Sequence, residues 1–363
     1  MRAVRVRVPG KLMLMGEYAV TQVGHPGIVT AIDRFLSCTI EPSAHYRLDF
    51  PNMGSSPVRA AQWDSLRQRL NDVPRLELVN RTLMLVGRYL REEGRNLPPF
   101  RLTVTSELQT ASGIKYGFGS SAAVSVALVA ALLRYATTAD PEREAAFKLA
   151  AAAHLLTQGN GSCADIAAAT HGGVIYYRRF DAAWLGRRLT GGSLHELVED
   201  RWPGLGIERL PHGPASFLRV GWTGQPVPTP AFLERMAAFK DRSPAVFQRF
   251  LVQSDRAVEA FAEAMKSGNL GVLFRAIGDN RSALTMLASE ARMPIETEAM
   301  RKALKTVERL GGKGKTSGSG GGDAIVAWFS TEDTTPTLRN QWKHDGMELM
   351  MVSPIEQGIT YDQ

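Results

Sequence analysis

The sequence predicts an α+β protein of two domains, and three observations support this. Short alternating runs typical of strands are interleaved with longer runs of helical periodicity. The pattern of apolar and polar residues changes at Trp202-Pro203-Gly204, and from 231 to 310 this pattern is mainly helical. The length of 363 residues is enough for one large or two medium domains. We therefore expect a boundary near residue 205, with domains at 1–205 and 206–363.

The first part of the chain is expected to alternate between strands and helices. Period-two patterns predict strands at 2–8, which ends at Pro9-Gly10, and at 100–106, whereas 28–40 indicates one or two strands. Residues 43–72 are polar and are expected to form surface loops. The remaining elements predicted up to residue 205 are helices at 76–93, 124–133 and 141–156, a short loop and helix at 159–170, and a strand at 174–179.

The second part begins with two strand-like runs, 206–210 and 217–222, followed by a proline-rich connector at 223–230. After the helical region, a glycine-rich loop at 311–323 leads into an apolar strand at 324–329. We call 311–323 the second glycine-rich loop. A helix at 334–344 and a strand at 347–352 are predicted to complete the domain.

Composition narrows the classes of function. The formal net charge is +7, but the basic residues are spread along the chain, so we expect no nucleic-acid partner. Two distant cysteines exclude a disulfide framework and fit a cytoplasmic protein. The N-terminus lacks the apolar stretch of a signal peptide, and no run reaches about 18 uninterrupted apolar residues, so no membrane partner is expected.

Two glycines and two serines directly precede the most apolar helix, in Lys115-Tyr-Gly-Phe-Gly-Ser-Ser121. We call residues 117–122 the first glycine-rich loop. Glycine lets backbone N–H groups approach an anion, and a helix N-terminus favours negative charge. The spacing fits neither a Walker A loop nor a dinucleotide fingerprint. A phosphate cradle and an ordinary turn with a serine N-cap both remain open from this stretch alone.

Three further features suggest a site. The second glycine-rich loop has three consecutive glycines close before a core strand, which suggests backbone pressed against a ligand or another loop; a flexible hairpin is the alternative. Lys11 is expected just after the first strand, where it either points into a cleft or is solvated. Asp165 is a single acid in a small, apolar stretch, which either works in a site or balances a helix dipole.

Together these segments resemble the three motifs of the GHMP kinases. The matching stretches are PGKLMLMGEYAV at 9–20, KYGFGSSAAVSVA at 115–127 and KTSGSGGGDAIVAW at 315–328, in the family's order. Within the family, the resemblance is greatest to the bacterial phosphomevalonate kinases, through GEYAV, the lysine before the first glycine-rich loop, and the stretches at 202–211, 218–229 and 339–349.

The resemblance implies a ribosomal-protein-S5-domain-2-like N-terminal domain, a ferredoxin-like C-terminal domain, and an active cleft between them. It implies transfer of the ATP γ-phosphoryl group to 5-phosphomevalonate, with Mg²⁺, by a monomer or homodimer. The implied residues are Lys11 and Asp165 for catalysis; Lys115, Gly117, Gly119, Ser120, Ser121, Ala122, Gly320 and Gly321 for ATP and phosphate; Lys11, Lys115, Ser162, Asp165, Ser317 and Ser319 for the substrate; and Ser120 or Ser121 for Mg²⁺.

Two points remain open from the sequence. Asp165 is expected either to orient Lys11 or to take a proton from the acceptor. The rival functions are another small-molecule kinase of this family, such as a mevalonate kinase, and a non-catalytic ligand- or RNA-binding protein on the same fold.

Overall fold

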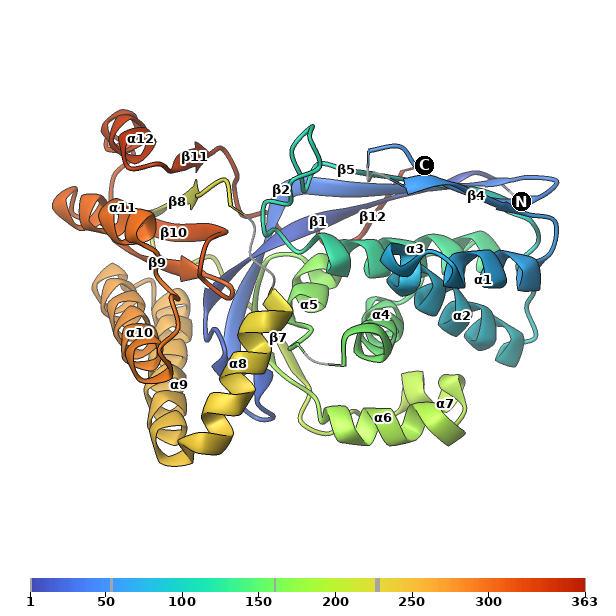
Figure 1. Ribbon diagram of the computed structural model, residues 1–363, viewed down its shortest axis with the longest axis horizontal. Helices are drawn as coiled ribbons and strands as arrows, with labels where there is room; N and C mark the ends of the chain where they lie inside the picture. Colours follow the sequence, from blue (N-terminus) through green and yellow to red (C-terminus); the bar gives the residue numbers. More distant parts are fainter. Residues whose placement is uncertain (1, 53–54, 160, 226–228, 363) are drawn as a thin grey trace.

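The computed structural model describes residues 2–52, 55–159, 161–225 and 229–362. The strands form two separate sheets, one of eight strands and one of four (Figure 1). The strands of the larger sheet are β1 (Val4–Met15), β2 (Pro26–Pro42), β3 (Tyr46–Phe50), β4 (Ser55–Ala60), β5 (Phe100–Ser106), β6 (Val174–Arg178), β7 (Gly206–Leu210) and β12 (Thr360–Asp362). Its main order is β12-β1-β2-β5-β3-β4, and β6 joins β2 to β7. Only the β3–β5 pair is parallel among these pairings.

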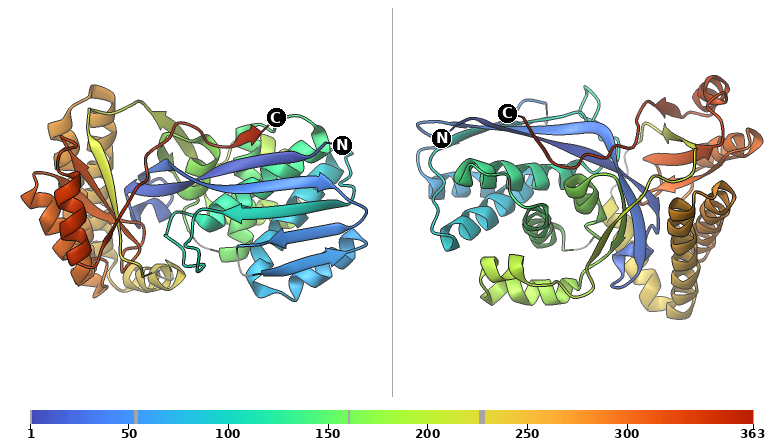
Figure 2. Two further views of the ribbon diagram at one scale, coloured as in Figure 1. Left: turned by 90° about the horizontal axis from the view of Figure 1, so that it is seen from above. Right: turned by 180° about the vertical axis from the view of Figure 1, so that it is seen from behind.

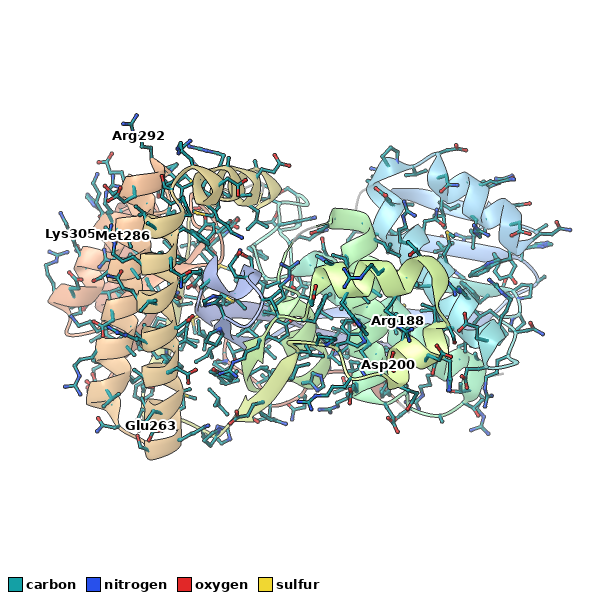
Figure 3. All side chains as sticks on the ribbon, turned by 90° about the horizontal axis from the view of Figure 1, so that it is seen from below. Arg188, Asp200, Glu263, Met286, Arg292 and Lys305 are labelled. Carbon is teal, nitrogen blue, oxygen red and sulfur yellow. The ribbon has the colours of Figure 1, made fainter. Side chains whose placement is uncertain are left out.

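Helices cover one face of the larger sheet, and Figure 2 shows the strands of the other face uncovered. The helices of this part are α1 (Trp63–Asn71), α2 (Glu77–Glu92), α3 (Ser120–Thr137), α4 (Arg143–Gln158), α5 (Ala164–His171), α6 (Ala182–Gly191) and α7 (Leu194–Glu199), with short 3₁₀ turns at Ala19–Thr21 and Pro74–Leu76. Below the layer formed by α3 and α4, α6 and α7 lie side by side, and Arg188 on α6 is 2.6 Å from Asp200 just after α7 (Figures 1 and 3).

Helix α3 is the central core helix. Nearly all of its side chains are buried, because it packs against β1 and β2 on one side and α2, α4 and α5 on the others. By length and hydropathy it is the one helix among the described residues that could cross a membrane, and 78% of it is buried inside the fold. The predicted buried helix is therefore confirmed.

The smaller sheet has the order β11-β8-β10-β9 and is antiparallel throughout. Its elements are β8 (Phe217–Trp222), α8 (Thr229–Arg242), α9 (Pro244–Ser267), α10 (Leu270–Ala291), α11 (Glu298–Arg309), β9 (Lys313–Ser317), β10 (Ala324–Phe329), α12 (Thr335–His344) and β11 (Glu348–Met350). Numbered along the chain, the strand order is 4-1-3-2 with helices before the second and fourth strands. This is the predicted ferredoxin-like arrangement. The long helices α9 and α10 pack side by side (Figure 3).

The chain passes between the sheets twice. β7 pairs with β6 in the larger sheet, whereas β8 belongs to the smaller one, so the first passage lies between Leu210 and Phe217. The predicted boundary at residue 205 stays a prediction. After β11 the chain returns, and β12 pairs with β1, so both termini lie at the larger sheet (Figure 2).

Three predictions of local structure are wrong. The first strand does not end at Pro9-Gly10: a register shift there absorbs the proline, and β1 continues to Met15, so Lys11 lies within the strand. Residues 43–72 form β3, β4 and α1, because β3 finds its partner β5 some fifty residues away. The second glycine-rich loop begins as strand β9, buried by its pairing with β10. Residues 226–228 of the predicted connector lie outside the described residues.

Candidate active site

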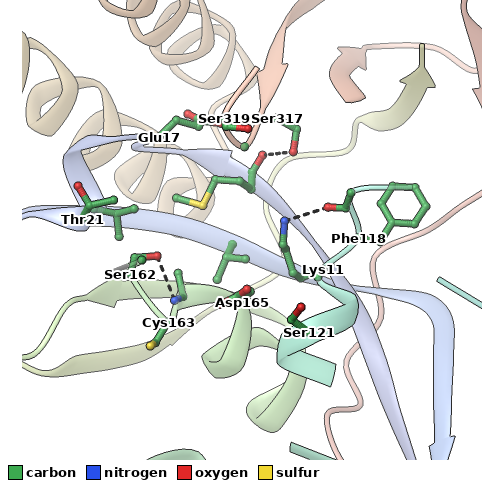
Figure 4. A pocket seen from close by; sticks show the side chains of 18 of the residues that line it. Lys11, Glu17, Thr21, Phe118, Ser121, Ser162, Cys163, Asp165, Ser317 and Ser319 are labelled. Atoms are coloured by element: carbon green, nitrogen blue, oxygen red, sulfur yellow. Dashed lines mark hydrogen bonds between the residues drawn. The ribbon is translucent and has the colours of Figure 1, made fainter. Parts of the chain in front are cut away.

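A cavity of about 460 Å³ opens between the two parts of the molecule (Figure 4). Segments far apart in the sequence line it: β1, the first glycine-rich loop, the start of α5 and the second glycine-rich loop. The predicted site residues that line it are Lys11, Lys115, Gly117, Gly119, Ser120, Ser121, Ser162, Asp165, Ser317 and Ser319. Ala122, Gly320 and Gly321 do not line it.

The first glycine-rich loop leaves the start of α3 without a cap. Gly119 is the N-cap residue in the left-handed region, with φ of 78°, and no side chain caps the helix. The first backbone bond of the helix runs from Ala123 N to Gly119 O, so the N–H groups of Ser120, Ser121 and Ala122 have no acceptor within the helix. A serine N-cap, the ordinary alternative, is thereby excluded, and the helix start can receive an anion.

Lys11, on β1, packs closely against this loop. The stem of Lys11 crosses Gly119 so closely that a Cβ there would lie 2.8 Å from Lys11 Cγ. The Lys11 ammonium donates to Gly117 O at 3.1 Å, and Lys11 N donates to Phe118 O at 3.0 Å. The cation is therefore held beside the uncapped helix start, where it adds to the positive potential of the helix dipole.

Helix α5 presents a second helix start to the same cavity. Its N-cap is Cys163, which has φ of 63°, and no N-cap side chain closes the helix. Ser162 Oγ accepts from Ala164 N at 3.2 Å, and Tyr177 donates to Ser162 O at 2.7 Å from behind. Asp165 follows in the first turn. The carboxylate of Asp165 is thus placed at the cavity by a short helix. The residues at the start of this helix are held by the hydrogen bonds of Ser162.

Asp165 does not hold Lys11 directly. Among the described residues, no ion pair within 4.0 Å joins the two, and the Lys11 ammonium has Gly117 O as its partner. Figure 4 shows both side chains in the cavity, with Lys11 bonded toward the first glycine-rich loop. A role for Asp165 in orienting Lys11 by direct contact therefore finds no support in the geometry. Its alternative role, taking a proton, stays a prediction.

The second glycine-rich loop meets the end of β1 through buried polar contacts. Ser317 Oγ donates to Met13 O at 2.9 Å, and Tyr18 donates to Ser319 O. The Lys315 ammonium pairs with Glu17, and both side chains are almost wholly shielded from solvent. Burial raises the pKa of Glu17 and lowers that of Lys315, while their attraction opposes both shifts. These contacts tie the two domains together at the cavity.

Gly320 and Gly321 serve packing instead of lining the cavity. A Cβ on Gly320 would lie 2.3 Å from Ile295 O, and one on Gly321 would lie 2.3 Å from the Phe232 ring. Gly321 N also donates to Ile295 O at 2.8 Å. The turn therefore lies against the residues before α11 and on α8, behind the serines that face the cavity.

Several lining residues were missed from the sequence. Asp323 closes the second glycine-rich loop and faces Gly117, His154 is buried on α4 with Nδ1 unpaired, and Gln158 and Thr21 complete the wall. The sequence did contain a signal for Asp323. A charged residue between a run of three glycines and a buried apolar strand is unusual, and this position could have indicated a residue of the site. His154 sits in an alanine-rich helix, and nothing in its spacing distinguishes it from a core residue.

The oxygen donors around the cavity fit Mg²⁺ in company with phosphate. Carboxylates of Asp165 and Asp323 and the hydroxyl of Ser121 line it. Mg²⁺ is usually held by one or two carboxylates together with substrate phosphates and water. Among the described residues no group of three or more histidine, cysteine or acidic side chains could hold an ion by itself. The site therefore suits a Mg²⁺ ion that binds together with a phosphate-bearing ligand.

The reactivity of Cys163 tests whether this residue lines the cavity as the structure shows. Burial raises the pKa of its thiol well above the ordinary value. Because only the thiolate reacts, we expect iodoacetamide to modify Cys163 slowly at pH 7–8, at a rate that still climbs above the free-cysteine pKa of about 8.5. Mass spectrometry of the labelled peptide follows the rate. ATP should slow labelling, since Cys163 lines the cavity; a rate that levels off near pH 8.5 would contradict the expectation.

Comparisons with known protein families agree with this arrangement. Residues 77–173 match the family model described as the GHMP kinases N terminal domain. Residues 257–347 match the one described as GHMP kinases C terminal. The two matches together cover more than half of the chain, and each lies within one of the two predicted domains.

Individual relatives extend the likeness over the whole chain. The chain is 32% identical over 375 residues to a phosphomevalonate kinase of Streptomyces sp. (strain CL190), with 99% of each covered. It is 25% identical to a mevalonate kinase of Archaeoglobus fulgidus, covering 89% of this chain and 92% of that one.

Solved structures give the same likeness in three dimensions. A Lin0012 protein from Listeria innocua superposes with a TM-score of 0.90 at 33% identity, covering all of both chains. Streptococcus pneumoniae phosphomevalonate kinase in complex with phosphomevalonate and AMPPNP superposes with a TM-score of 0.85 at 28% identity, covering 98% of this chain and 100% of that one.

Proposed function

Because the chain belongs to the GHMP kinase family, with the predicted fold confirmed, we propose that it is an ATP-dependent phosphomevalonate kinase. The reaction breaks the bond between the γ-phosphorus of ATP and the bridging oxygen of ADP. It forms a bond from that phosphorus to a phosphate oxygen of 5-phosphomevalonate, giving 5-diphosphomevalonate. The observation that carries the proposal is one cavity that brings together the uncapped start of α3, the start of α5 and two lysines, Lys11 and Lys115, which suits two anionic partners.

Phosphoryl transfer depends mainly on positioning and on neutralising charge. The N–H groups of residues 120–122 would receive the ATP phosphates. Ser121 or Ser120, with a cavity carboxylate, would hold Mg²⁺, which would supply positive charge to offset that of the triphosphate. Lys11 would stabilise the charge that is shared between the γ-phosphoryl group and the acceptor oxygen in the transition state.

Lys115 is the residue we propose to grip the acceptor's own phosphate. It is exposed at the cavity mouth, next to the first glycine-rich loop, and so can reach a second anion without displacing the first. We expect Lys115→Met to raise the KM for phosphomevalonate by about tenfold or more, with a smaller change in kcat, since the lost contact is present before and during transfer. Steady-state kinetics in both substrates measure this; an unchanged acceptor KM would contradict the assignment.

Asp165 is expected to assist the acceptor. A phosphomonoester has its second pKa near 6, so at neutral pH it is already largely a dianion and needs little help to lose a proton. We expect Asp165→Asn to lower kcat about tenfold at pH 7, below the usual range for an essential general base. The loss should grow as the pH falls below 6, where the acceptor carries a proton. A loss that is the same from pH 5.5 to 8 would point away from proton transfer.

The proposed function is tested with an ADP-release assay over four acceptors: phosphomevalonate, mevalonate, homoserine and galactose. Phosphomevalonate should be preferred, with ³¹P resonances of a diphosphate ester in the product. Preference for mevalonate would favour the rival supported by the likeness to archaeal mevalonate kinases. No turnover with any acceptor, together with salt-sensitive RNA binding, would favour the non-catalytic rival. We also propose a cytoplasmic monomer or homodimer without nucleic-acid or membrane partners.

A further inference from the structure

The chain returns from the smaller sheet to the larger one in residues 353–362, which we call the return segment (Figure 2). It follows β11, runs alongside β2, and ends in β12, which pairs with β1. Along β2, Asp33 N donates to Ser353 O at 3.0 Å, and Ile355 N donates to Ala31 O at 3.1 Å. The return segment is therefore bonded to the larger sheet over most of its length.

The return segment also contacts the C-terminal end of α5. Ile359 N donates to Thr170 O at 3.2 Å, and Gly173 N donates to Ile355 O at 2.8 Å. Thr170 O belongs to the last turn of the helix, where the carbonyl groups have no donor within the helix itself. The return segment thus supplies a donor that the end of α5 lacks.

Two glycines make this contact a close one. A Cβ on Gly358 would lie 2.2 Å from Thr170 O and 2.6 Å from His171 C, and one on Gly172 would lie 2.3 Å from Gly358 N. Gly172 has φ of 72°, whereas the φ of Gly358 is not positive. Position 358 therefore requires glycine because two backbones approach each other there, and not because of its own conformation. Since the atoms in contact belong to the backbone, no flexible side chain can move aside.

The other end of α5 carries Asp165 to the cavity. The helix has eight residues, most of them buried, and it packs against β1, β2, β6, α3 and α4. This packing fixes the helix laterally, whereas the contacts at its two ends fix it along its axis. An eight-residue helix is about 12 Å long. A shift of its C-terminal end along the axis is passed to Asp165, because a closely packed interior transmits such displacements.

We propose that Gly358 is a positioning residue for Asp165. Its close contact with the end of α5 sets how far the helix extends toward the cavity, and so where the Asp165 carboxylate lies relative to the acceptor. The inference rests on the proposed function, in which Asp165 assists the acceptor.

Gly358→Ala in the full chain tests this inference. We expect kcat to fall about tenfold, because a displacement of about 1 Å at a reacting group has effects of this size or larger. The KM for ATP should stay within about threefold, since the first glycine-rich loop is not part of the contact. Gly186→Ala on α6 is the matched control: its φ is also not positive, and a Cβ there would have no atom within 4 Å. Steady-state ADP release measures both variants.

A double-mutant cycle separates positioning from a general structural effect. If Gly358 acts through Asp165, Gly358→Ala should lower kcat less than about twofold in an Asp165→Asn background. Amide hydrogen exchange gives a second measurement that needs no substrate. Exchange in peptides spanning residues 164–173 should become faster in Gly358→Ala and stay unchanged in Gly186→Ala, because only the first variant loosens the end of α5.

Arg209→Met keeps the inference testable if Gly358→Ala fails to fold. Arg209 is exposed on β7, donates to Glu356 O at 2.8 Å and pairs with the Glu356 carboxylate, two residues before Gly358. Its loss should free the return segment beside the contact, speed exchange at 164–173 and lower kcat about threefold. Arg209→Lys keeps a cation for Glu356 and should recover most of the lost kcat.

Three results would overturn the inference. If folded Gly358→Ala has a kcat within about twofold of that of Gly186→Ala, the contact has no part in catalysis. Equal fold losses with and without Asp165→Asn place the effect elsewhere. Unchanged exchange at 164–173 shows that the return segment does not hold α5. Preference for an acceptor other than phosphomevalonate removes only the proposed substrate, because the cycle is then run with the preferred acceptor, and the exchange measurement requires none.

Discussion

Lys11→Met should lower kcat by about 10²–10³-fold, the range found when one preorganised group that stabilises transition-state charge is removed. Methionine retains most of the stem that packs across Gly119, so the backbone of the loop should keep its shape. What is lost is the ammonium that donates to Gly117 O beside the start of α3. The charge on the transferring phosphoryl group then lacks the ammonium that would stabilise it in the transition state, and the loss should appear in kcat more than in either KM.

Stopped-flow or steady-state ADP release, with both substrates saturating, measures this effect. Lys305→Met is the matched control, because Lys305 is an exposed lysine on α11 that is not among the residues lining the cavity. A variant with its melting temperature intact and kcat within about threefold of the parent would remove Lys11 from catalysis, since such a value lies far outside the expected loss.

The convergence of the three motifs could be predicted from the sequence, and the contacts that hold them could not. Glycines followed by an apolar helix indicate a cradle locally, because the helix start and its dipole belong to the same stretch. The pairing of Glu17 with Lys315 joins residues almost three hundred positions apart and has no local signature. Asp323 against Gly117 is similar: each residue is visible in its own loop, but their contact depends on how the domains pack.

The errors in the fold have the same origin. Residues 46–50 form a strand because Leu48 and Phe50 become buried when β3 pairs with β5, not because of their own alternation. The start of the second glycine-rich loop, Lys313–Ser317, is polar and glycine-containing, yet it becomes an edge strand since β10 offers it a ladder of backbone partners. Local patterns predicted elements well where a long apolar face existed, as in α2 and α3, and failed where a distant partner decided the structure.

Gly119→Ala is the second substitution for which a large effect is expected, because it disturbs the cradle and the lysine together. Gly119 has φ of 78°, which disfavours alanine, and the new Cβ would lie 2.8 Å from Lys11 Cγ and 3.1 Å from its Cε. Either Lys11 leaves its place beside Gly117 or the N-cap of α3 shifts. Both outcomes misplace groups that must meet the same phosphate, so we expect kcat/KM for ATP to fall about 10²-fold or more.

The control separates the contact from backbone strain. Gly94, just after α2, has φ of 68°, and a Cβ added there would have no atom within 4 Å, so Gly94→Ala carries the same kind of conformational penalty without a steric clash. Gly94→Ala should lose a modest amount of stability, about 1 kcal/mol, and keep its activity. If Gly119→Ala and Gly94→Ala lose stability alike and both retain kcat/KM, the approach of Lys11 to Gly119 has no part in catalysis. A combined Lys11→Met, Gly119→Ala variant should lose little beyond the worse single variant, because the two changes break one arrangement.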